Sequence, residues 1–167
     1  DLAATQLAGE SDQDGDGLRG RKVLVVDDNS TNRAILLGHV VGWGMSAEVA
    51  ADGTEALEKL RLAAKCGHAY DIVLIDMLMP GLDGIETTNQ VRADPRLTGL
   101  RIVMLTSMNQ VAATRAARDA GVDRYVVKPV RKAQLFSAMR ISLGLAPEEA
   151  DPRAEAGEPT ALVRLNV

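Results

Sequence analysis

Short apolar runs recur along the chain from residue 22 onward, and they do not alternate with polar positions. Four of these runs are KVLVV (22–26), DIVLI (71–75), RIVML (101–105) and RYVV (124–127). Near-continuous runs rich in β-branched residues are typical of strands that are covered on both faces, as in a parallel sheet. The weaker run SAEVAA (46–51) predicts a fifth strand, which is second in chain order.

Segments with a helical period separate these runs. The predicted helices cover residues 30–41, 54–64, 83–92, 109–120 and 132–143. Ser30 is in position to cap the first helix, and a glycine or an Asp-Pro pair ends each of the five. Five strands that alternate with five helices predict an α/β fold. Right-handed crossovers then favour a (βα)5, doubly wound, flavodoxin-like three-layer sandwich around a five-stranded parallel sheet.

The flanking segments differ from this region in composition. Residues 1–20 are rich in Gly, Asp, Ser and Gln without an apolar period, which is typical of a linker. We therefore place the folded domain at residues 21–145. Residues 146–160 are charged and contain proline, which indicates a second linker. Residues 161–167 turn apolar again and resemble the truncated start of a following domain.

Composition and charge narrow the function classes. The net charge is −4 and no Lys/Arg cluster with interleaved aromatic residues occurs, so nucleic-acid binding by this domain is disfavoured. A single cysteine, Cys66, excludes an internal disulfide and fits a reducing cytoplasm. No apolar stretch reaches the roughly 18 to 20 residues that span a bilayer, so we expect no direct membrane contact. A longer parent protein is still free to carry a membrane anchor.

Polar and charged residues follow the predicted strands. Asp27 and Asp28 follow the first strand, Asp76 the third, Thr106 the fourth and Lys128 the fifth. Ligands of open α/β sheets bind beyond the carboxyl ends of the strands, so we expect these side chains to converge. Three close carboxylates cannot all stay ionised without a cation, and hard oxygen ligands suit Mg²⁺. Asp76, on the central run, is the candidate nucleophile for phosphorus, with Lys128 and Thr106 contacting the phosphoryl oxygens.

Four motifs carry a family resemblance. VLVVDDNSTNR, VLIDMLMPGLDG, MLTS and VVKP, in this order and spacing, resemble the receiver (response-regulator) domain of two-component phosphorelays over about residues 21–145. The resemblance implies that Asp76 is the phosphoacceptor, that Asp28 binds Mg²⁺ directly and that Asp27 binds it through water. It also implies that the backbone carbonyl of Leu78 is a metal ligand.

The same resemblance assigns roles to the later motifs. It implies that Thr106 and Lys128 contact the phosphoryl group and that Tyr125 is the aromatic switch residue. It further implies a cis peptide bond between Lys128 and Pro129, which directs the lysine inward.

The motif DDNSTNR resembles the corresponding motif of receivers that are fused to hybrid sensor histidine kinases. By this resemblance the partners are a histidine kinase core, a histidine phosphotransfer domain and a second receiver, and the location is cytoplasmic. The domain would catalyse phosphoryl transfer from a phosphohistidine to its own Asp76. The alternative is a docking module that binds and inhibits the kinase core, with phosphorylation optional. A metal-dependent phosphatase is less favoured, because Leu78 stands where such enzymes commonly carry a second acid.

Two positions depart from the pattern common in receivers, where polar side chains orient the hydrolytic water. These positions hold Leu78, two residues beyond Asp76, and Met108, two residues beyond Thr106. Leucine has no hydrogen-bonding group and a thioether is only a weak acceptor, so we predict a comparatively long-lived phospho-Asp76. Combining Leu78→Asn with Met108→Glu should speed the loss of phosphate in a time course. An unchanged rate would refute this prediction.

Overall fold

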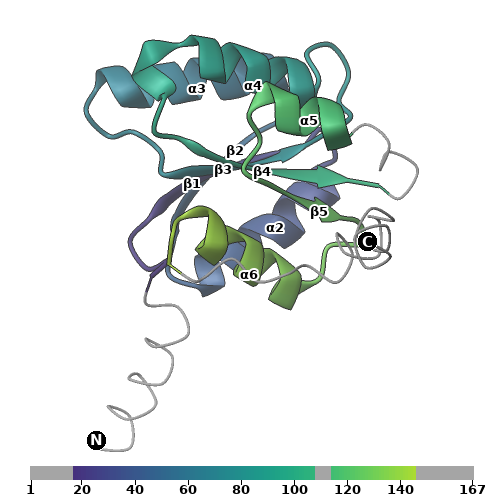
Figure 1. Cartoon of the computed structure of the whole chain (residues 1–167). Helices are drawn as coiled ribbons and strands as arrows, with labels where there is room; N and C mark the ends of the chain where they lie inside the picture. Colours follow the sequence, from purple (N-terminus) through teal and green to yellow (C-terminus); the bar gives the residue numbers. More distant parts are fainter. Residues whose placement is uncertain (1–16, 108–113, 146–167) are drawn as a thin grey trace, which may run out of the picture.

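A parallel sheet of five strands forms the centre of the molecule (Figure 1). The structure, a computed structural model, describes residues 17–107 and 114–145. The strand order is β2-β1-β3-β4-β5, so the order reverses at β1, as predicted for a doubly wound sheet. The strands are β1 (Lys22–Val26), β2 (Ser46–Ala50), β3 (Ile72–Asp76), β4 (Arg101–Thr106) and β5 (Arg124–Val127).

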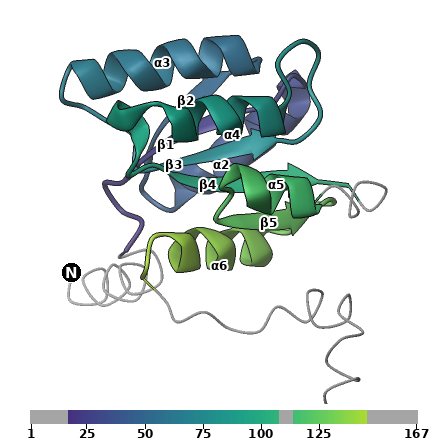
Figure 2. The ribbon, with the colours of Figure 1, turned by 45° about the horizontal axis from the view of Figure 1, so that its top comes forward.

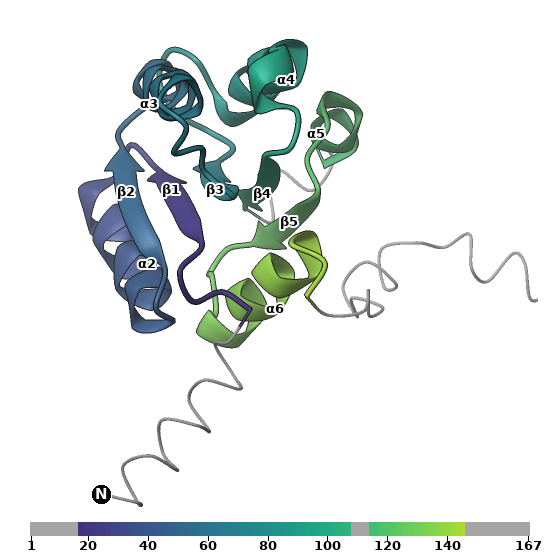
Figure 3. The same ribbon diagram turned by 90° about the vertical axis from the view of Figure 1, so that its left-hand side faces the viewer.

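Helices cover both faces of the sheet. Seen along the sheet, α2 and α6 lie on one face, and α3, α4 and α5 lie on the other (Figure 3). The last three follow one another across their face (Figure 2). This arrangement confirms the predicted three-layer sandwich. The helices are α2 (Ser30–Gly42), α3 (Gly53–Lys65), α4 (Gly84–Ala93), the 3₁₀ helix η1 (Pro95–Leu97), α5 (Thr114–Ala120) and α6 (Lys132–Ser142).

The strands bury alternate residues in two separate cores. In β1, Leu24 and Val26 face the core under α3, α4 and α5, whereas Val23 and Val25 face the core under α2 and α6. All four side chains are fully buried, which explains why their run is continuously apolar rather than alternating. The core contains few aromatic residues, and Trp43 packs against Phe136 where α2 meets α6.

The structure corrects the predicted N-terminal cap of α2. Ser30 is the first residue of α2, but the capping side chain is Asn29, whose Oδ1 accepts the backbone N–H of Asn32 at 3.0 Å. The prediction that Ser30 caps this helix was therefore wrong by one residue. Both residue types cap helices well, and only the extended backbone at Asn29 distinguishes them.

The fourth predicted helix, 109–120, is described only in part. Its described portion is α5, which begins at Thr114, and residues 109–113 lie outside the described residues. Met108 also lies outside them. The predicted break at Asp94-Pro95 is present, and the chain continues there as η1 before β4.

The packed structure begins before the first strand. Leu18 is fully buried in the core under α2 and α6, although its segment has the composition of a linker. The N–H of Arg21 donates to the carbonyl of Leu18 at 3.0 Å, which closes a turn ahead of β1. Gly17 lies directly against Leu145, because a Cβ on Gly17 would be 2.5 Å from Leu145 Cδ1. The two ends of the described chain therefore pack together.

We predict that Leu18 contributes to stability like any core leucine. Leu18→Ala should lower the free energy of unfolding by about 2 to 4 kcal/mol, because it removes buried methyl groups and leaves a cavity. Chemical denaturation measures this change. Leu62→Ala is the control, because Leu62 is 63 % exposed and should change stability by less than about 0.5 kcal/mol. Equal stabilities of the two variants would contradict the role assigned to Leu18.

Candidate functional site

Three carboxylates meet at the carboxyl ends of β1 and β3, next to the point where the strand order reverses. Asp27 and Asp28 follow β1, and Asp76 is the last residue of β3. Val26 of β1 is paired with Ile75 of β3, so the residues that follow them lie side by side. Oxygen atoms of the three carboxylates lie within 4.8 Å of one another. In the described ranges, this is the one group of three or more acidic, His or Cys side chains with metal-binding spacing.

Burial distinguishes the three acids. Asp27 is fully buried and Asp76 is 6 % exposed, whereas Asp28 lies at the surface. Oδ1 of Asp27 accepts the N–H of Asn29 at 2.9 Å. Oδ2 of Asp27 is also buried, and no described residue donates a hydrogen bond to it. An unpaired buried carboxylate oxygen is costly, and a cation or its bound water would satisfy it.

Lys128 provides the positive charge opposite these acids. Its Nζ lies 2.9 Å from Oδ1 of Asp76. The Lys128–Pro129 peptide bond is cis, as expected, and the N–H of Lys128 donates to the carbonyl of Thr106 at 2.6 Å. Burial raises the pKa of Asp76 above its ordinary value of 3.8. Lys128 opposes this rise in pKa, and the negative charges of Asp27 and Asp28 add to it.

Thr106 and Tyr125 lie on the neighbouring strands β4 and β5, and Asp76 of β3 is paired with Leu105, the residue before Thr106. Thr106 is fully buried, and its hydroxyl donates to the thioether sulfur of Met77 at 3.6 Å. Tyr125 is half-buried and packs on the core under α3, α4 and α5. The guanidinium carbon of Arg118 lies 5.4 Å from the Tyr125 ring centroid, and Arg118 also donates to the phenol oxygen at 3.4 Å. Thr106 therefore lies beside the end of β3 that carries Asp76, whereas Tyr125 is paired with Met104, two residues before Thr106 in β4.

Leu78 lies in the loop that follows β3. Its neighbours Met77 and Met79 are buried, 3 % and 7 % exposed, while the Leu78 side chain is 61 % exposed. The N–H of Gly84 donates to the carbonyl of Met77 at 2.9 Å and closes this loop. The Leu78 side chain therefore projects from a loop whose backbone is anchored on both sides.

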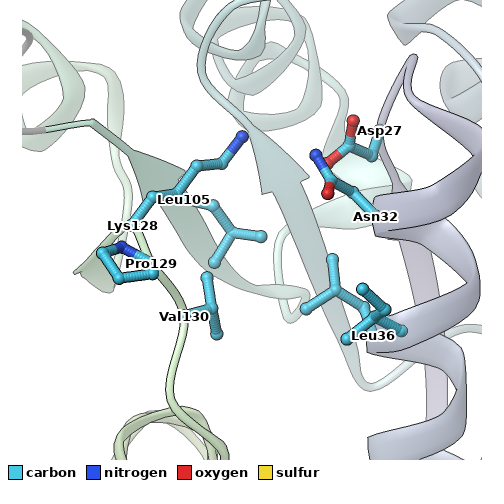
Figure 4. Close-up of a pocket in the computed structure, with 8 residues that line it drawn as sticks. Asp27, Asn32, Leu36, Leu105, Lys128, Pro129 and Val130 are labelled. Atoms are coloured by element: carbon cyan, nitrogen blue, oxygen red, sulfur yellow. The ribbon is translucent and has the colours of Figure 1, made fainter.

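A cavity of about 240 Å³ adjoins the site between α2 and the segment after β5 (Figure 4). The polar groups of Lys128 and Asp27 point toward each other across its upper end, and apolar side chains line the rest. Asn32 and Ile35 also line the cavity, and the sequence motifs did not predict either residue as part of the site. Their position in the first turns of a helix that starts beside Asp27 was the available signal. The lining residues are Asp27, Asn32, Ile35, Leu36, Leu105, Lys128, Pro129 and Val130.

Comparison with curated proteins gives two informative relatives. The chain is 38 % identical over 121 residues to the autoinducer 2 sensor kinase/phosphatase LuxQ of Vibrio vulnificus, which is 72 % of this chain and 13 % of LuxQ. It is 32 % identical over 123 residues to the DNA-binding response regulator MtrA of Mycolicibacterium paratuberculosis, which is 74 % of this chain and 51 % of MtrA. The chain thus spans only part of the length of either relative.

A solved structure shows the same fold. It is the receiver domain of sensor histidine kinase PA1611 from Pseudomonas aeruginosa PAO1, with a magnesium ion coordinated in its active site cleft. The two chains are 27 % identical, with a TM-score of 0.64, over 75 % of this chain and 98 % of the other. Residues 23–140 match the family described as the response regulator receiver domain. This match covers more than half of the chain, which therefore belongs to the response regulator receiver family.

Proposed function

We propose that this domain takes a phosphoryl group from a phosphohistidine onto Asp76, with Mg²⁺ held by the acidic cluster, and changes conformation to signal in a phosphorelay. The observation that carries the proposal is the convergence of three carboxylates within 4.8 Å, with Lys128 paired to Asp76 at 2.9 Å. Structural stability does not require this arrangement, because like charges at such spacing destabilise one another.

The residues present fit a hard divalent cation. The exposed carboxylate of Asp28 is available for direct coordination, and the buried, unpaired Oδ2 of Asp27 is suited to hold a metal-bound water. Asp76 and the backbone carbonyl of Leu78 complete the proposed ligand set, all of which are oxygens. When bound, Mg²⁺ would neutralise charge on the phosphoryl oxygens during transfer.

The remaining groups account for the transfer step. A carboxylate oxygen of Asp76 attacks phosphorus, the bond between phosphorus and the donor imidazole nitrogen breaks, and an aspartyl phosphate results. Lys128, already 2.9 Å from Asp76, would pair with a phosphoryl oxygen, and the Thr106 hydroxyl would leave Met77 to donate to another. Catalysis would consist mainly of positioning and charge neutralisation.

Signalling would use the elements on either side of Thr106 and Tyr125. In this proposal, Thr106 would move toward the phosphoryl group, and the half-buried Tyr125 ring would change position with it. Such a movement changes the face formed by α5, β5 and α6. Phosphorylation would shift an equilibrium between two conformations, and only to the extent that the phosphoryl group interacts differently with each.

The parent protein is proposed to be a hybrid histidine kinase, and the similarity to the sensor kinase/phosphatase LuxQ supports this context. The proposed partners are a histidine kinase core, a histidine phosphotransfer domain and a second receiver, all in the cytoplasm. Among the helices of residues 17–107 and 114–145, none combines the length and apolarity that a bilayer crossing requires.

A docking role without obligatory phosphorylation is the second candidate. The cavity beside Lys128 favours it, because Ile35 at its edge is 53 % exposed and offers apolar surface to a partner. The same surface also suits a phosphodonor that must approach Asp76, so docking and phosphorylation are compatible. A chain whose Asp76 does not accept phosphate would favour the docking role alone.

We predict that a small phosphodonor such as acetyl phosphate modifies the wild-type chain only when Mg²⁺ is present. Intact-mass measurement should show a gain of one phosphoryl group, and Asp76→Ala should show none. Asp28→Asn should react far more slowly, because it removes a proposed direct metal ligand, while retaining the native circular dichroism spectrum. Absence of modification in the wild type, together with absence of Mg²⁺ binding, would favour the docking module.

The raised pKa of Asp76 predicts a pH-dependent effect on stability. The folded chain binds this proton more tightly than the unfolded chain does, so ionised Asp76 destabilises the metal-free fold as pH rises above 3.8. Asp76→Asn should therefore be more stable than wild type in EDTA at about pH 7.5, and the difference should shrink as the pH falls to about 4, near the ordinary pKa of the carboxyl group. Denaturant unfolding at both pH values measures the difference.

Saturating Mg²⁺ serves as the control in this comparison. It should stabilise the wild type more than Asp76→Asn, because only the wild type retains the full set of carboxylates. A variant that is less stable than wild type in EDTA at both pH values would show that the pair with Lys128 outweighs the desolvation of Asp76.

A further inference from the structure

Helix α3 makes an unusually close contact at its first residue, Gly53. A Cβ built on Gly53 would lie 2.1 Å from the hydroxyl oxygen of Thr87 and 2.7 Å from the carbonyl oxygen of Leu82. Real Cβ atoms essentially never lie closer than 3.0 Å to such atoms. The backbone of Gly53 is not in the left-handed region, so the requirement for glycine is steric and not conformational.

The segment in close contact with Gly53 is connected to Asp76, the proposed phosphoacceptor. Leu82 lies in the loop that begins directly after Asp76 and is closed by the hydrogen bond between Gly84 and Met77. Gly84, between Leu82 and Thr87, makes a second close approach. A Cβ there would lie 2.5 Å from the carbonyl oxygen of Asp76 and 2.9 Å from Cα of Met77. Two glycine contacts in series thus connect the start of α3 to the backbone of Asp76.

The residues that precede Gly53 are hydrogen-bonded to the residue that follows β1. The N–H of Asp27 donates to the carbonyl of Ala50, the last residue of β2, at 3.2 Å. Two residues later Asp52 caps α3, with its side chain accepting the N–H of Glu55 at 2.8 Å. The start of α3 is therefore linked, through the short segment after Ala50, to the strand end that carries Asp27.

We propose that Gly53 is a positioning residue for the metal and phosphoryl site, because its missing side chain sets the spacing between the Asp27 side and the Asp76–Leu78 backbone. The inference rests on the proposed function, since it concerns Mg²⁺ held by those groups. The three atoms nearest the Cβ position of Gly53 belong to Thr87 and Leu82 and not to a proposed metal ligand, so Gly53 would act through Leu82, Thr87 and Gly84.

A methyl group at this position would displace the site. To reach even the closest contact that Cβ atoms tolerate, 3.0 Å, the buried Thr87 hydroxyl would have to move by about 0.9 Å and the Leu82 carbonyl oxygen by about 0.3 Å. Functional groups must be held to within about 0.5 Å of their working geometry. Mg²⁺ is especially demanding, because it requires near-ideal octahedral ligands at short distances. We therefore expect Gly53→Ala to weaken Mg²⁺ binding by at least about tenfold, the usual effect of losing a supporting contact.

The test is isothermal titration calorimetry of Mg²⁺ with the whole chain, wild type and variants. Gly38→Ala is the matched control, because Gly38 is an exposed glycine of α2 with nothing within 4 Å of its Cβ position. It should bind Mg²⁺ as the wild type does. Thr87→Ala removes the closest atom, so the double variant with Gly53→Ala should bind Mg²⁺ more tightly than Gly53→Ala alone.

Unfolding of the same variants in EDTA separates positioning from a merely structural role. Lower stability of Gly53→Ala with unchanged Mg²⁺ affinity would overturn the proposal. If Gly53→Ala does not fold, the double variant compared with Thr87→Ala decides, because its Cβ still meets the Leu82 carbonyl at 2.7 Å. Equal affinities in that pair would also overturn the proposal. A wild-type chain that binds no Mg²⁺ would instead refute the proposed function.

Discussion

Mutual repulsion among three carboxylates is the constraint on which the rest of this structure depends. Oxygen atoms of Asp27, Asp28 and Asp76 lie within 4.8 Å of one another, and two of the three side chains are buried. Each charge disfavours ionisation of the others, and removal from water adds to the cost. Hydrogen bonds between β1 and β3 hold the acids together regardless. A cation bound among the acids would relieve this repulsion, which is why the arrangement supports the proposed Mg²⁺ site.

The packing around the acids keeps them in place against that repulsion. The N–H of Met77 donates to the carbonyl of Leu105 at 2.9 Å, and the N–H of Lys128 donates to the carbonyl of Thr106 at 2.6 Å. These hydrogen bonds continue the pairing of β3 with β4 and of β5 with β4 by one residue past the ends of β3 and β5. They hold the ends of the three strands side by side. On the α3 side the restraint is steric, because Gly53 lets two backbone segments approach within contact distance. The repulsion among the carboxylates and the packing that holds them together therefore act against each other in this site.

Much of the fold was predictable from local patterns. The four strong apolar runs became β1, β3, β4 and β5, because a strand buried on both faces needs nearly every residue apolar. The weaker run became β2, an edge strand that is only partly buried. Other features had no local signal. Leu18 is buried although its segment reads as a linker, because a single leucine among Gly, Asp and Arg forms no periodic pattern. The choice of Asn29 over Ser30 as the cap depended on backbone angles that either residue can adopt.

The sequence by itself determined which residues stand at the strand ends, and so which acids, hydroxyl and ammonium could meet. Only the tertiary structure decided how they meet. It buries Asp27 and Asp76 but leaves Asp28 exposed, and it sets Lys128 against Asp76 at 2.9 Å. These differences depend on the strand order and on loops packed against distant helices. Such contacts join residues far apart in the chain, and no local pattern of hydrophobic and polar positions encodes their distances.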